Sequence, residues 1–234
     1  MGRIDVHAHL LPGIDDGSKS VNESVGMARK MVAAGYSDLF CTPHIWPTLT
    51  NNMQSIKANI ALLQGKLDAG GVPLKLHPGG EMNLRVGMEH MSAEEVVTYN
   101  DGGKYAIFDF WADEYPGNFW PFIERLQSFG IQPILAHPER ISALQRYPHS
   151  IDEFPSRGLL IQCNLECLGE ETVTIRRKLA ERWLQDGEYF MLGSDMHGLN
   201  SLDRRLNGLL RAMQLVGEEE VTHLTVDHPA QLLT

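Results

Sequence analysis

The sequence has few cysteines and no long apolar run. Its cysteines (Cys41, Cys163 and Cys167) form no C-x-x-C pair and no even disulfide framework, which fits a reducing compartment. No apolar stretch approaches the ~18 residues needed to cross a bilayer, and residues 1–7 lack the apolar core of a signal peptide. We therefore expect a cytoplasmic protein without membrane insertion.

The sequence also lacks two features that would point to other functions. A cysteine-dependent phosphatase places an arginine six positions after its nucleophile, and here those positions hold Pro47, Gly169 and Val173. Basic residues number 20 against 30 acidic ones, a formal net charge of −10, and they form no stripe. Phosphate backbones need clustered Lys and Arg, so we expect no nucleic-acid partner.

Short β-like runs alternate with helical patterns along the chain, as in βα units. The 234 residues suit one domain or two small ones; because no linker or repeat stands out, we take 1–234 as a single domain. The expected strands are Arg3–His7, Asp38–Thr42, Leu74–Pro78, Tyr105–Phe110, Gln132–Ala136, Leu159–Asn164 and Tyr189–Gly193. The expected helices are Ser20–Ala34, Met53–Ala69, Phe119–Phe129, Thr172–Gln185 and Ser201–Leu215, with a helix-bearing tail over Glu218–Leu233.

Seven such repeats fit either a distorted (β/α)7 TIM-like barrel or a doubly wound open sheet, and periodicity does not separate the two. Polar residues follow six of the seven strands at their C-terminal ends, where barrel active sites lie. An open sheet would concentrate them at one switch point. The pattern therefore favours the α/β barrel; only the strand that ends near Asn164 has no obvious ligand.

The polar residues at the strand ends are metal-ligand types. His7 and His9 are two apart on a strand, so both imidazoles face the same side, and Asp195 and His197 repeat this spacing. Asp109 is an acid inside an apolar run, where a buried carboxylate is costly without a cation. Taken alone, each of these residues could be an ordinary turn or loop residue. Their shared position at the strand ends predicts a metal site. The set is His7, His9, Asp16, His44, Glu81, Asp109, His137, Asp195 and His197.

In chain order the motifs at these positions resemble the polymerase-and-histidinol-phosphatase (PHP) superfamily. More narrowly, they are similar to its bacterial manganese-dependent protein-tyrosine phosphatases, which are encoded with capsule and exopolysaccharide genes. The resemblance spans Ile4 to about His197 and is most specific from Ile4 to Ser18. The motifs are H-x-H (7–9), D-D-G (15–17), T-P-H (42–44), G-G-E (79–81), H-P-E-R (137–140) and S-D-x-H (194–197).

The resemblance implies a PHP-type barrel with three divalent metal sites, filled by Mn²⁺ first, with Fe²⁺, Co²⁺ or Zn²⁺ as alternatives. One metal would be held by His7, His9, Glu81 and Asp195. Glu81 and His137 would reach a second metal, and the other ligands would complete the second and third. The family acid on the fourth strand is usually Glu, so Asp109 is one methylene shorter than expected.

The resemblance also implies the chemistry. A water activated by paired metal ions would attack phosphorus, Arg140 would stabilise the transition state, and His44 and Asp16 would share the catalytic work. The substrate would be a phosphotyrosine-bearing protein, namely the tail of a tyrosine kinase that regulates capsule or exopolysaccharide synthesis. A second family arginine has two candidates here, Arg204 and Arg205, at a shifted spacing.

A phenol leaves easily, with a pKa of ~10, so a metal-rich site without an obvious general acid suits phosphotyrosine. Three aromatic residues follow strand ends (Trp46, Trp111 and Tyr115), and they either line a pocket for the tyrosine ring or pack over the rim.

The sequence also fits other functions. A small-molecule phosphatase of the same superfamily, of the histidinol-phosphate or nucleotide type, would share these motifs. Amidohydrolases and TatD-like nucleases also open with H-x-H, but amidohydrolases often place a lysine after the fourth strand, where this chain has Asp109. A non-catalytic metal-binding PHP scaffold would be marked by lost ligands, and none is lost.

Overall fold

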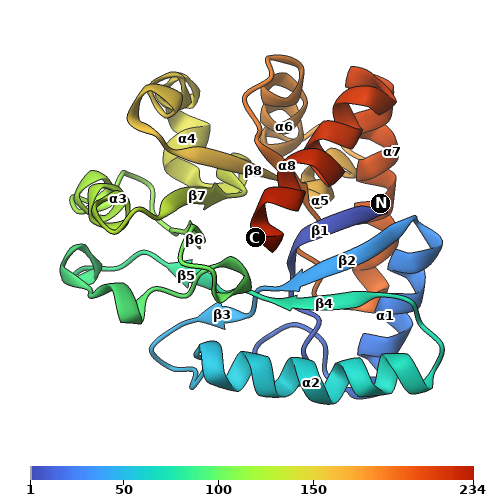
Figure 1. Ribbon diagram of the computed structural model, residues 1–234. Coiled ribbons are helices and arrows are strands. Elements are labelled where there is room, and N and C mark those ends of the chain that lie inside the picture. The colour runs from blue at the N-terminus through green and yellow to red at the C-terminus, as the bar shows by residue number, and fades with distance from the viewer. Residues whose placement is uncertain (1) are drawn as a thin grey trace.

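Parallel strands curl around a common centre, with helices outside them (Figure 1). The computed structural model describes residues 2–234. One ladder has the order β1-β2-β4 and the other the order β3-β5-β6-β7-β8-β9. The strands are β1 (Arg3–Ala8), β2 (Tyr36–Cys41), β3 (His44–Ile45), β4 (Lys75–Pro78), β5 (Glu81–Asn83), β6 (Tyr105–Asp109), β7 (Gln132–Ala136), β8 (Leu160–Asn164) and β9 (Met191–Gly193).

The two ladders join where the chain makes short breaks between consecutive strands. Pro43, which has no N–H for a ladder, separates β2 from β3, and Gly79-Gly80 separates β4 from β5. Pairing continues through the breaks, because the Glu81 N–H donates to the Pro43 carbonyl at 3.1 Å. The nine strands within residues 2–234 therefore fill seven positions. The second and third expected strands each continue into a short strand that the sequence did not predict.

The sheet closes on itself between the last strand and the first. Beyond β9, the Asp195 N–H donates to the His7 carbonyl at 2.6 Å, and the His9 N–H donates to the Met196 carbonyl at 3.0 Å. Ala8 and Met196 form the parallel bridge at this seam. The seven-position TIM-like barrel is confirmed, and the doubly wound alternative is wrong.

Helices cover the outer face of the sheet, as Figure 1 shows. The expected helix 53–69 is confirmed with these bounds, since Asn52 caps it through the Ser55 N–H. The helix expected over 201–215 runs on to Thr222 across a kink at Gly217, where φ is 86°. Within residues 2–234, none of the helices is both long and apolar enough to cross a bilayer. They are α1 (Val21–Ala33), α2 (Met53–Ala69), α3 (Phe119–Ser128), α4 (Ser142–Arg146), α5 (Leu165–Leu168), α6 (Ile175–Gln185), α7 (Leu199–Thr222) and α8 (His228–Ala230).

Apolar side chains fill the barrel below the polar strand ends. Ile4 and Val6 of β1 pack in one buried cluster with Phe40, Ile134 and Leu232, so the C-terminal segment contributes to this interior. The pairing of β1 with β2 shifts register between Asp5 and Ala8. A shift of this kind changes which side chains face inward, and above it the inward side chains are imidazoles.

Two glycines let α5 and α7 approach closely behind the strand ends. A Cβ on Gly208 would lie 1.9 Å from the Leu165 carbonyl oxygen, and a Cβ on Gly169 would lie 1.9 Å from the Arg204 carbonyl oxygen. These backbone atoms cannot move aside without displacing a helix.

We predict that Gly208→Ala lowers the free energy of unfolding by about 2 kcal/mol or more, the cost of overpacking a tight contact. Gly65→Ala is the control: Gly65 lies exposed in α2 with nothing within 4 Å of an added Cβ. That change should raise stability by about 1 kcal/mol through helix propensity. Urea unfolding measures the free energy of unfolding of both variants. Equal values would contradict the tight contact between α5 and α7 at Gly208.

Candidate metal centre

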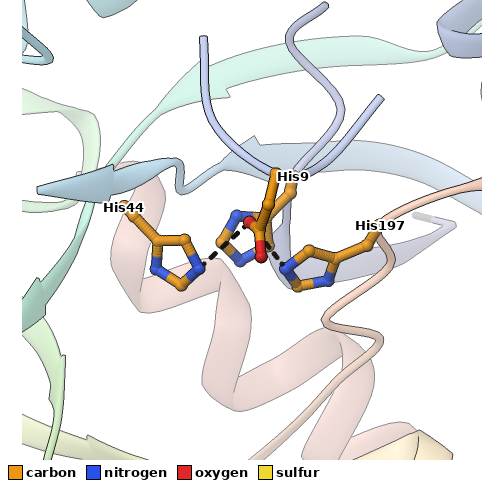
Figure 2. Close-up of side chains that lie close together, drawn as sticks. His9, His44 and His197 are labelled. Atoms are coloured by element: carbon orange, nitrogen blue, oxygen red, sulfur yellow. Dashed lines mark ion pairs between the residues drawn. The ribbon is translucent and has the colours of Figure 1, made fainter. Parts of the chain in front are cut away.

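Six of the nine expected metal-binding residues line one pocket of about 360 Å³ at the strand ends, namely Asp16, His44, Glu81, His137, Asp195 and His197. Eight of the nine fall into three groups in which one ligand atom from each member lies within 4.8 Å of the others. Figure 2 shows three of these side chains, His9, His44 and His197, gathered in one place. The groups are His9–Asp16–His44–His197, His7–His9–Asp195 and His7–Glu81–His137.

The donor atoms fit divalent cations better than they fit one another. His44 Nδ1 and Glu81 Oε2 are buried and 2.9 Å apart, yet neither makes a hydrogen bond. His7 Nε2 and His9 Nε2 approach within 3.3 Å. Buried polar atoms are normally paired, so atoms that converge without bonding are placed to share a cation. Imidazole and carboxylate donors without a thiolate suit Mn²⁺, Fe²⁺, Co²⁺ and Zn²⁺.

Asp109 is the expected ligand that lies outside the three groups. It is buried at the end of β6, where one carboxylate oxygen accepts a hydrogen bond from Asn83 Nδ2 at 2.8 Å and the other has no partner. Burial, and then the charge of Glu81, raise its pKa well above the usual range. The carboxylate of Asp109 thus lies outside the three groups, with one oxygen free of hydrogen bonds.

Comparison with known proteins agrees with the fold and the donor set. Residues 3–234 match the family model described as capsular polysaccharide synthesis, CpsB/CapC. The chain belongs to the CpsB/CapC family. It is 24% identical to tyrosine-protein phosphatase YwqE of Bacillus subtilis (strain 168), over 98% of this chain and 91% of that protein. It is 23% identical to tyrosine-protein phosphatase CpsB of Streptococcus agalactiae serotype V, over 98% of both chains.

A solved structure, from work on YwqE of Bacillus subtilis and CpsB of Streptococcus pneumoniae, superposes on this chain with a TM-score of 0.89. The overlap covers 98% of this chain and 94% of the other, at 24% identity, and those proteins are described as unique metal-dependent tyrosine phosphatases. The resemblance to PHP-type phosphatases of capsule clusters is therefore confirmed at the level of the family.

In this CpsB/CapC chain, neighbouring acceptors fix the orientation of three imidazoles. Nδ1 of His7 faces Gln162 Oε1 at 2.9 Å, Nδ1 of His9 faces Asp15 Oδ2 at 2.8 Å, and Nδ1 of His197 faces the Asp195 carbonyl at 2.8 Å. Each acceptor calls for a proton on Nδ1, which leaves the Nε2 lone pair free to bind a metal.

The two adjacent acids of the D-D-G motif have different roles. Asp16 is exposed at the mouth, with its Oδ1 3.3 Å from His44 Nε2 and 3.4 Å from His197 Nε2. Asp15 is turned inward, where it accepts hydrogen bonds from the Gly17 and His44 N–H groups besides its contact with His9. Burial would raise the pKa of Asp15, but His9 and these donors lower it to about 2. Asp15 was not among the residues predicted from the sequence, because the motif does not show in which direction a side chain of a turn points.

The sixth strand position, which offers no ligand, supplies supporting amides. Gln162 of β8 orients His7, and Asn164 Nδ2 donates to Asp195 Oδ2 at 2.8 Å. The Asn164 N–H also donates to the buried Glu139 at 2.7 Å. These two residues were missed because amide side chains are not typical metal ligands.

Asp195 has a left-handed backbone, with φ of 50°, as has His137, with φ of 35°. Such strain in non-glycine residues persists only where surrounding contacts hold it, and it clusters at functional sites. Arg205 of α7 provides such a contact: it is buried and donates to the Ser194 carbonyl at 2.8 Å and to the Asp195 carbonyl at 2.8 Å.

Neither candidate for the second arginine lines the pocket. Arg205 lies behind Asp195, and Arg204 lies on the surface, where it pairs with Glu166 at 3.1 Å. Arg140 does line the pocket, and its Nη1 lies 2.5 Å from Asp195 Oδ2.

Two of the three expected aromatic residues, Trp46 and Trp111, line the pocket. Tyr115 does not line it. Its ring instead packs against Phe110 and Phe119 at centroid distances of 5.8 and 5.0 Å, in line with the packing alternative.

The acids and imidazoles of the centre shift one another's charge states. Burial would raise the pKa of Glu81, but His7, His137 and His44 hold it well below the usual range. Burial likewise would lower the pKa of His7, yet Glu81 and Asp195 raise it. Glu81 and Asp195 are therefore anionic at neutral pH, as metal ligands must be.

Glu139, next to the catalytic candidate Arg140, behaves differently. It is fully buried, and burial raises its pKa from 4.5 to about 7, although the Asn164 N–H and the Tyr189 hydroxyl donate to it. The folded chain thus holds this proton more tightly than the unfolded chain. The resulting stabilisation is complete below pH 4.5 and is lost as the pH rises through about 7.

We predict that Glu139→Gln removes this pH-dependent loss of folding stability, which is on the order of 2–3 kcal/mol between pH 5 and 8. Urea unfolding in EDTA at several pH values, for the wild type and the variant, measures the difference. Asp5, whose pKa burial raises to about 6, contributes equally to both proteins. Parallel stability curves for the two proteins would show that Glu139 does not titrate as described.

We also predict that Asp15→Asn weakens Mn²⁺ binding by about 10–100-fold, the usual effect of losing a carboxylate behind a metal-bound imidazole. Asp38→Asn is the matched control, because Asp38 pairs with His77 at the same 2.8 Å but away from the pocket. Calorimetric titration of metal-free protein measures both. An unchanged Mn²⁺ affinity in Asp15→Asn would show that Asp15 does not orient His9 for metal binding.

Proposed function

We propose that this chain is a metal-dependent protein-tyrosine phosphatase that acts in capsular or exopolysaccharide synthesis. The observation that carries the proposal is the convergence of five imidazoles and three carboxylates in three groups that share members, six of which line the pocket that also holds Arg140. The tyrosine phosphatases YwqE and CpsB, to which the chain is similar along nearly its whole length, support it.

The metal would be held by His7, His9, Asp16, His44, Glu81, Asp109, His137, Asp195 and His197, and Mn²⁺ is the ion we propose first. When bound, divalent ions supply positive charge for the phosphoryl oxygens and lower the pKa of water. The acids alone would repel a phosphate dianion, since Glu81 and Asp195 are anionic in the pocket.

The chain's own residues would then bind the phosphoryl group and move protons. Arg140 is partly exposed in the pocket, where its guanidinium can hold phosphoryl oxygens as their charge rises. We assign His44 and Asp16, at the mouth, to catalysis: both would hold the attacking water in place, and the Asp16 carboxylate would accept its proton. A phenolate leaves with a pKa of ~10 and needs little help from a general acid.

The partner we propose is a phosphotyrosine-bearing protein, specifically the tail of a tyrosine kinase. We also propose that residues 1–234 act as a single domain, since the closing seam joins β1 to the segment after β9. The three cysteines are buried and free, which supports a cytoplasmic location.

We expect Arg140→Ala to lower kcat for a phosphotyrosine peptide by about 10²–10³, the usual cost of losing one transition-state donor. Arg146→Ala is the control, because Arg146 is an exposed arginine that pairs with Glu114 outside the pocket. Phosphate release is measured after EDTA treatment and reloading with Mn²⁺, Fe²⁺, Co²⁺ or Zn²⁺.

A near-wild-type rate in Arg140→Ala would remove that residue from the mechanism. Turnover of histidinol phosphate with none of the peptide would instead indicate a small-molecule phosphatase. Release from neither substrate with any metal would leave a non-catalytic metal-binding scaffold.

A further inference from the structure

Trp111 is an exposed aromatic residue in a pocket that is otherwise charged. It stands just after β6, and its side chain is 59% exposed, whereas Trp183 is fully buried. Apart from Trp46, the other residues that line the pocket are acids, histidines and Arg140. The exposed indole therefore offers a flat aromatic surface to a ligand beside the charged groups of the pocket.

Trp111 is held in place from the inner side. The guanidinium carbon of Arg140 lies 5.2 Å from the centre of the indole ring, and the His137 ring centre lies 6.3 Å away. Trp111 and Arg140 also line a neighbouring pocket of about 240 Å³, so the indole forms the wall between two hollows. Its other surface remains open to a ligand.

The second tryptophan of the pocket is fixed differently. Trp46, just after β3, stacks on His44 with ring centres 4.1 Å apart and an angle of 18°. It is half-buried and committed to a candidate metal ligand. Of the two tryptophans in the pocket, Trp111 is therefore the one whose aromatic surface is free to contact a ligand.

We propose that Trp111 binds the phenyl ring of the substrate and thereby sets the preference for aryl over alkyl phosphate monoesters. This rests on the proposed phosphatase function. A phenyl ring beside the indole gains an offset or edge-to-face aromatic contact while its phosphate reaches Arg140 and the ligand groups. A phosphoserine or a sugar phosphate offers no aromatic ring to Trp111.

A different role for Trp111 would give a different result. If the indole only oriented Arg140, its loss would weaken every phosphate ligand alike. A direct contact with the ring weakens aryl ligands alone, so paired ligands that differ only in the ring separate the two roles.

The test is calorimetric binding of phenylphosphonate and methylphosphonate to Mn²⁺-loaded protein, for the wild type, Trp111→Ala and Trp111→Phe. Trp111→Ala should lose about tenfold in phenylphosphonate affinity and keep its methylphosphonate affinity, while Trp111→Phe should recover most of the loss. Tyr147→Ala is the control, because Tyr147 is an exposed aromatic residue outside both hollows and should leave both affinities unchanged.

In turnover of a phosphotyrosine peptide, Trp111→Ala should raise KM about tenfold and change kcat less than twofold. Equal losses for both phosphonates, or no loss for either, would overturn the role of Trp111 even if the peptide is hydrolysed. Failure of the wild type to hydrolyse the peptide would count against the proposed function instead, while the phosphonate comparison would still decide the ring contact.

Discussion

The Glu81 carboxylate and the imidazoles around it are the interaction on which the pocket depends. Glu81 is almost fully buried, yet its oxygens lie 2.9 Å from His44 Nδ1 and from His137 Nε2, and 3.4–3.5 Å from Nε2 of His7 and His9. A buried carboxylate is stable only with compensating positive charge or donors. Without metal, His7 and His9 provide it, since the neighbouring acids raise their pKa values against the effect of burial. Divalent ions provide more positive charge and leave the imidazoles as neutral ligands. The same side chains can therefore fold as a pocket and bind cations.

The backbone of the barrel is strained at two residues that line the pocket. The left-handed backbone of His137 and Asp195 directs both side chains inward, and contacts behind the strand ends hold it. Arg205 binds the Ser194 and Asp195 carbonyls from α7, which lies close because Gly169 and Gly208 leave room between the helices. The contacts that stabilise the strand ends therefore also fix the geometry of the pocket. This is expected where backbone strain is kept at a functional site.

Much of this could be predicted from the sequence, because ligand spacing and strand ends are local features. Residues two apart on a strand share a face, so His7 with His9 and Asp195 with His197 were recognisable pairs. The short strands β3 and β5 were not, since Pro43 and Gly79-Gly80 look like strand ends although pairing resumes after them. The inward turn of Asp15 and the support from Gln162, Asn164 and Arg205 depend on contacts between distant segments. Position after a strand end did not decide whether Tyr115 lines the pocket or packs beside it, because its packing against Phe110 and Phe119 is set by the tertiary structure.

We propose that the strand ends hold several divalent cations between these imidazoles and acids. Anomalous diffraction at the manganese absorption edge, from crystals grown with Mn²⁺, would locate such ions. We expect anomalous peaks inside the pocket, in contact with Glu81 and with the Nε2 atoms of His7 and His9. Peaks confined to the outer surface, or a pocket whose side chains bond only to one another in saturating Mn²⁺, would contradict it.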